Sequence, residues 1–177
     1  SNRSSILKYA FLGFFNAAYK NYLFMEATAR QEYSSTLPPG RNSYFYPSVN
    51  TSFVFSDAYK MPSFINYGKL RASYGVVGNA PPAYASGITY TQTSLPTANG
   101  PVTSLSTQVN AGNNEIRPEN KYEMEFGFEA KLFKSRLGID VTYYNSRTID
   151  QIIQLTVPVS TGAVSKLVNA GELQSSG

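Results

Sequence analysis

Three closely spaced glutamates are the strongest candidates for chemistry in this sequence. Glu123, Glu125 and Glu129 lie in a segment whose intervening residues are mostly apolar. Carboxylate pairs act as general acid and general base in many hydrolases. On an extended strand, however, these three positions share one face, and the sequence suggests no base or nucleophile opposite them. A hydrated strand face explains them better than a catalytic set, so the sequence predicts no enzyme.

Two weaker patterns could bind a phosphate or a metal ion. Residues 75–79 (GVVGN) resemble a phosphate-binding loop, but they lack the Lys-Ser/Thr pair and the strand–helix context that such a loop needs. Asp57 and Asp140 could ligate calcium, but the clustered oxygen ligands of a calcium site are missing around them. The sequence therefore predicts a turn at a strand end, no metal site and no cofactor.

The glutamates belong to two long segments in which apolar and polar residues alternate. These segments, Tyr122–Leu132 and Leu137–Tyr144, are separated by the polar turn Phe133–Arg136. Each is close to the length of about ten residues that a tilted strand needs to cross a bilayer, whereas strands of soluble proteins are usually nearer five or six. Long alternating strands with tyrosines at the ends away from the turn indicate a transmembrane β-barrel hairpin.

The alternation assigns side chains to two environments. The residues expected to face lipid are Met124, Phe126, Phe128, Leu137, Ile139 and Val141. The residues expected to face the lumen are Lys69, Arg71, Glu123, Glu125, Glu129 and Asp140, together with Gly127 and Thr142. No substrate-binding residue is assigned among them.

The turn also predicts a charge conflict. Pairing Phe133 with Arg136 places Glu129 opposite Asp140, and like charges in that position are unfavourable, so a nearby cation is expected. If no strand pair intervenes, the strand Tyr67–Tyr74 lies beside Tyr122–Leu132. At least one of its cations, Lys69 or Arg71, should then lie within ion-pair reach of Glu123, Glu125 or Glu129, the three carboxylates of the adjacent strand.

Composition agrees with a barrel and excludes several other classes. The 177 residues include 14 Tyr and 11 Phe but no Cys, Trp or His, and no run of about 18 apolar residues could form a transmembrane helix. The absence of Cys excludes a disulfide-stapled secreted domain. A net charge of +4 without a basic cluster gives no reason to expect nucleic acid as a partner.

The remaining sequence predicts about seven long strands in total. Short turns alternate with longer loops, as in outer-membrane barrels. One early strand is expected to run from Tyr44 to Ser56, and residues 76–118 form a probable extracellular loop. Within that loop, 84–93 and 102–109 read equally well as short strands above the membrane or as ordered loop. Seven strands with open edges should not close into a barrel alone.

Four stretches, in order, resemble one protein family. They are Phe45–Ser48; Lys69–Gly75 with Gly78-Asn79; Ile116–Glu119; and Tyr143–Asn145 through Thr148–Asp150 to Pro158–Gly162 and Asn169–Gly171. The set is similar to the SusC/RagA family of TonB-dependent outer-membrane transporters of Bacteroidetes-type bacteria. The resemblance covers most of residues 45–171.

The resemblance implies an all-β fold in which residues 1–177 form an internal part of a large antiparallel 22-stranded transmembrane barrel. The plug domain, the TonB-binding segment and the barrel ends would lie outside this chain. A multi-pass outer-membrane protein of this family imports glycans or oligopeptides beneath a SusD-like surface lipoprotein, with energy supplied through TonB.

Two alternatives from other classes stay open. A passive porin, or another barrel without energy coupling, would share the wall but would lack the plug and the TonB-binding segment. A soluble carbohydrate-binding module is disfavoured by the strand length and by the absence of Trp, the usual platform for stacking sugars.

Overall fold

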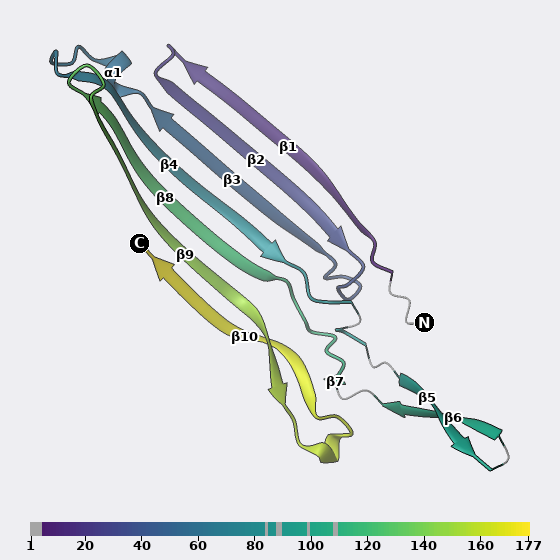
Figure 1. Ribbon diagram of the computed structural model, residues 1–177. Coiled ribbons are helices and arrows are strands. Elements are labelled where there is room, and N and C mark those ends of the chain that lie inside the picture. The colour runs from purple at the N-terminus through teal and green to yellow at the C-terminus, as the bar shows by residue number, and fades with distance from the viewer. Residues whose placement is uncertain (1–4, 84, 88–89, 99, 108–109) are drawn as a thin grey trace.

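The computed structural model describes residues 5–83, 85–87, 90–98, 100–107 and 110–177, and it consists mainly of long strands (Figure 1). The strands of the main sheet are β1 (Lys8–Tyr19), β2 (Leu23–Ser34), β3 (Ser43–Phe53), β4 (Ile65–Asn79), β8 (Glu119–Leu132), β9 (Leu137–Thr156), β10 (Ser165–Ser176) and the short β7 (Asn110–Ala111). A separate hairpin is formed by β5 (Tyr90–Thr97) and β6 (Gly100–Thr107). The predicted all-β class is confirmed.

The main sheet has eight strands in the order β1-β2-β3-β4-β8-β9-β10-β7. All neighbours pair antiparallel except β7, whose two residues pair parallel with β10. The sheet is open, because β1 stands at one edge and is paired with β2 alone in the described part of the chain. Setting aside the two-residue β7, seven long strands remain, as the sequence predicts.

The register of the glutamate hairpin follows the prediction from its turn. Leu132 pairs with Leu137, and Glu129 lies opposite Asp140. Phe133, Lys134 and Ser135 all have positive φ values of 53–61°, which lets four residues reverse the chain. β4 pairs with β8 along its whole length, so the β5–β6 hairpin inserts no strand between them. The predicted neighbourhood of Tyr67–Tyr74 and Tyr122–Leu132 is therefore confirmed.

Two expected boundaries are wrong, and one open alternative is decided. The strand expected over Tyr44–Ser56 ends at Phe53, because residues Phe55–Ala58 turn into the short helix α1. β4 continues to Asn79, so the first four residues of the expected loop 76–118 still belong to the sheet. Inside that loop, β5 and β6 pair from Tyr90 to Thr107, which favours strands over plain loop, although residues 84, 88–89 and 108–109 lie outside the described residues.

The connections differ in length at the two ends of the sheet. The turns at 20–22 and 133–136 and the α1 segment gather at one end, whereas the β5–β6 hairpin projects from the other (Figure 1). We call these the turn end and the loop end. None of the described residues forms a helix long and apolar enough to cross a membrane.

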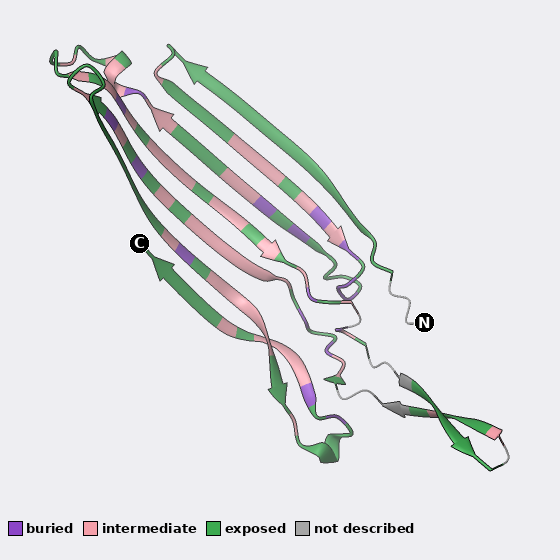
Figure 2. Cartoon of the chain, in the orientation of Figure 1, coloured by how far each residue is buried: buried purple, intermediate pink, exposed green. Residues whose placement is uncertain are grey.

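The two faces of the central strands differ in chemistry and exposure. One face, which we call the apolar face, carries the exposed side chains of Met124, Phe126, Phe128, Leu137, Ile139 and Val141, with Leu70 and Tyr74 of β4. The opposite, polar face of β8 carries residues that are half-buried or buried along most of the strand, which are Glu123, Glu125, Gly127 and Glu129, and this gives the banded pattern of Figure 2. Burial is therefore inverted relative to a soluble domain: the large apolar side chains are the exposed ones.

Aromatic rings line the turn end of the sheet. Tyr22 packs edge-on against both Tyr19 and Phe53, with ring centroids 5.7 and 5.9 Å apart. Phe55 of α1 stacks on Phe128 at 6.2 Å, where the missing side chain of Gly68 leaves space for its ring. Further pairs join Phe53 to Tyr59 and Phe64 to Phe133. Belts of aromatic residues at both edges of an apolar band are typical of transmembrane barrels.

Candidate functional site on the polar face

One ion pair links three strands across the polar face. Arg71 of β4 lies opposite Gly127 of β8, and its guanidinium continues to β9, where Nη2 lies 2.5 Å from Asp140 Oδ1 and donates to Thr142 Oγ1 at 2.9 Å. A Cβ atom at position 127 would lie 2.1 Å from Arg71 Nε. Because Gly127 has no side chain, the path along which Arg71 crosses β8 stays open.

The cation next to the acidic cluster is present, but its expected partner is wrong. Arg71 pairs with Asp140 and not with a carboxylate of β8, because the glycine opposite it lets the side chain pass one strand further. Glu123 pairs instead with Lys121 of its own strand. Lys69 lies opposite Glu129 in the register, yet the two form no ion pair among the described residues.

The Arg71–Asp140 pair reduces the repulsion between Glu129 and Asp140 that the register creates. Its side chains are 40% and 54% exposed, so water screens the attraction and its contribution to stability is at most about 1 kcal/mol. The pair therefore serves to arrange charge on this face more than to hold the sheet together.

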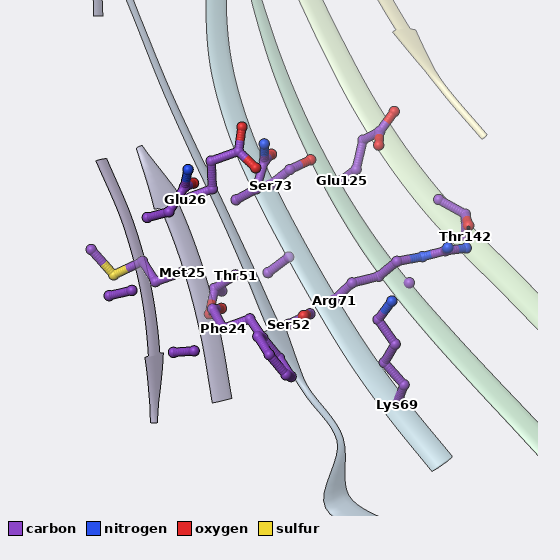
Figure 3. A pocket seen from close by; sticks show the side chains of 16 residues that line it. Phe24, Met25, Glu26, Thr51, Ser52, Lys69, Arg71, Ser73, Glu125 and Thr142 are labelled. Carbon is purple, nitrogen blue, oxygen red and sulfur yellow. Dashed lines mark hydrogen bonds between the residues drawn. The ribbon is translucent and has the colours of Figure 1, made fainter. Parts of the chain in front are cut away.

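A hollow of about 560 Å³ lies over the same face and extends from β1 to β9. Figure 3 shows the side chains that line it, and the polar ones are Asn16, Glu26, Asn50, Thr51, Ser52, Lys69, Arg71, Ser73, Glu125 and Thr142. Two cations, two carboxylates and several neutral donors and acceptors are thus available to a polar ligand. Among the described residues, no three His, Cys, Asp or Glu side chains gather to hold a metal ion.

The β1 edge of this face is apolar, which the sequence analysis missed. Asn16 pairs with Glu26 and Phe14 with Thr28, so Leu12 and Phe14 share the face of Glu26, and they are 69% and 76% exposed. The odd-numbered residues of β1, such as Phe11, are apolar as well. The register of the 20–22 turn was the signal that could have revealed a strand that is apolar on both faces.

At the loop end, beside the connection between β2 and β3, the polar face closes into a small buried cluster. Tyr44 Oη donates to Glu32 Oε1 at 3.0 Å, and Arg30 Nη2 lies 2.6 Å from Glu32 Oε2. Burial, and then the nearby Glu32 carboxylate, raise the pKa of Tyr44 to about 12. Tyr44 therefore stays protonated and remains a donor at physiological pH.

Comparison with known proteins supports a barrel wall. Residues 3–177 match the family described as TonB dependent receptor-like, beta-barrel. Three curated relatives from Formosa agariphila are similar to this chain. TonB-dependent receptor P26 is 30% identical over 95% of the chain, receptor P39 is 28% identical over 90%, and receptor P3 is 27% identical over 92%. The chain spans only 15–17% of their lengths.

Solved structures share the fold. The chain superposes on 18% of a chain in the "closed-closed" state of the RagAB peptide importer with a TM-score of 0.82 and 24% identity, covering 96% of its own length. The "open-open" state of the same importer gives a TM-score of 0.80. The siderophore receptor PirA from Pseudomonas aeruginosa gives 0.62 at 17% identity. These identities establish likeness of fold alone.

Proposed function

Because the chain belongs to the TonB dependent receptor-like β-barrel family, whose members are outer-membrane proteins, we propose that it forms part of the wall of an active importer. In this proposal the apolar face contacts lipid, and the polar face lines the lumen. The complete receptor takes up oligopeptides or glycans that are too large for passive pores, and this part supplies binding surface and no catalytic group.

The difference between the two faces is the observation that carries this proposal. Side chains such as Phe126 and Val141 are 51% and 60% exposed, an arrangement that is costly in water and favourable in hydrocarbon. The polar face meanwhile carries both signs of charge around a hollow. A wall with lipid on one side and a hydrated passage on the other satisfies both faces.

The partners follow from the SusC/RagA resemblance, which the family match and the fold of the RagAB structures support. We expect a SusD-like lipoprotein over the loop end and energy transfer from TonB to a part of the receptor outside this chain. RagAB is described as a peptide importer, so oligopeptides are the first substrates to test, with glycans second.

Uptake with and without energy coupling tests the function. Cells that carry the complete receptor should accumulate labelled oligopeptides or glycans, and accumulation should fall to the background of receptor-deleted cells when TonB is deleted or the proton gradient is collapsed. A passive porin would continue to equilibrate its solute under both treatments. Uptake that survives the loss of TonB would therefore replace the importer with the porin alternative.

A further inference from the structure

Residues 110–118, which we call the strap, follow the β5–β6 hairpin in the chain and attach to the loop end of β9 and β10. The strap begins with β7, whose Asn110 and Ala111 pair parallel with Ser165 and Lys166 of β10. It then crosses back over β9 and β10 to start β8 at Glu119. Ile116 in its centre is completely buried, so the strap is packed onto the sheet.

Asn169 of β10 binds the strap as a peptide group would. Its Oδ1 accepts the backbone N–H of Arg117 at 2.8 Å, and its Nδ2 donates to the Arg117 carbonyl at 2.8 Å. The same Nδ2 donates to the Asp150 carbonyl of β9, also at 2.8 Å. One side chain therefore ties the strap to two strands at the point where the β9–β10 ladder shifts register after Asn169.

Other side chains complete the attachment on both sides of the three Asn169 hydrogen bonds, which we call the clamp. Asn113 is buried, and its Nδ2 donates to the Leu167 carbonyl at 2.7 Å while its backbone N–H donates to the Ala85 carbonyl at 3.1 Å. At the start of β8, Glu119 Oε1 accepts the N–H of Ile152 at 2.7 Å. The strap is thus joined to β9, to β10 and to the segment that precedes the hairpin.

The hairpin that the strap carries is exposed and uncharged. No Asp, Glu, Lys or Arg lies between Arg71 and Glu115 in the sequence, and Leu95, Val102 and Leu105 are 50%, 55% and 67% exposed. An isolated two-stranded hairpin is marginally stable in water, so its orientation depends on how its two roots are fixed.

We propose that Asn169 is a positioning residue, which clamps the strap and thereby holds the β5–β6 hairpin in one orientation at the mouth of the barrel, where the ligand meets it. The proposal rests on the importer function proposed above. Asn169 and Ile116–Glu119 belong to two of the stretches that carry the SusC/RagA resemblance. In this proposal both stretches serve one structural role, which is to tie an extracellular loop to the wall.

Hydrogen exchange on the complete purified receptor tests the clamp itself. In Asn169→Ala three hydrogen bonds are lost, so amide exchange across residues 110–118 should be faster by about tenfold or more, while exchange in β1–β3 stays unchanged and shows that the barrel has folded. The matched control is Asn66→Ala, which removes an asparagine acceptor for the Ser135 N–H at the turn end and should leave the strap unaffected. Unchanged exchange in the strap of Asn169→Ala would overturn the proposal.

Uptake kinetics separate positioning from a loss of folded receptor. Asn169→Ala should raise the half-saturating ligand concentration several-fold and change the maximum rate by less than about twofold, because a loosened hairpin binds more weakly while the energised steps are intact. A lower maximum rate with unchanged half-saturation would indicate fewer folded receptors and would refute the positioning role. If the wild-type receptor shows no TonB-dependent uptake, the importer function fails, whereas the exchange result and ligand binding to purified receptor still decide the clamp.

Discussion

Replacing Val141 with arginine should destabilise the folded receptor in membranes by about 2–4 kcal/mol. Val141 is 60% exposed on the apolar face and lies between the aromatic residues of the turn end and Tyr143. In hydrocarbon a guanidinium at this depth loses its hydration and finds no partner. The measurement is equilibrium unfolding of the complete receptor from lipid vesicles, compared with wild type.

The control for this change places the same charge on the other face. Asn50 of β3 lies on the polar face between Glu26 and Ser73, so Asn50→Arg should cost far less, because water and a carboxylate are near. Equal costs for the two variants would mean that the faces do not differ in environment, and the assignment of lipid to the apolar face would be lost.

Replacing Gly112 with valine should disrupt the packing of the strap on the preceding turn, at a cost of about 1–3 kcal/mol. A Cβ atom at position 112 would lie 2.7–2.9 Å from backbone atoms of Ser86 and Gly87. Backbone cannot move aside as a flexible side chain can, so the strap and the turn must separate. Hydrogen exchange at residues 110–118 measures this opening directly.

Gly87, whose backbone lies against Gly112, provides the control for this prediction. A Cβ atom at Gly87 would meet no atom within 4 Å, so Gly87→Ala should leave exchange in the strap as it is in wild type. If Gly112→Val also exchanged at the wild-type rate, the close contact between strap and turn would be wrong.

What the sequence predicts well is local in origin. The alternation of Tyr122–Leu132 and the four-residue turn after it determine the register of β8 with β9, and with it the opposition of Glu129 and Asp140. A one-residue slip would exchange the two faces, so the pattern admits a single register. The neighbourhood of β4 and β8 follows once the β5–β6 hairpin stays outside the sheet.

What the sequence does not reveal depends on contacts between distant residues. Arg71 reaches Asp140 because Gly127 has no side chain, and no pattern within β4 contains that information. The clamp of Asn169 on Arg117 joins residues 52 positions apart. On β1, odd-numbered and even-numbered residues are both largely apolar, so alternation alone does not tell which face Leu12 and Phe14 occupy. The register of the 20–22 turn places them on the face of Glu26.

Cysteine scanning of β8 and β9 tests most directly whether the sheet separates lipid from a hydrated lumen. The 177 residues contain no cysteine, so single substitutions at Glu125, Phe126, Val141 and Thr142 in the complete receptor, cleared of any other cysteine, report on one position each. A membrane-impermeant thiol reagent should label positions 125 and 142, whereas a lipid-attached quencher should quench a fluorophore only at 126 and 141. Labelling and quenching that do not alternate between neighbouring residues, or that alternate in the opposite sense, would contradict the barrel-wall assignment.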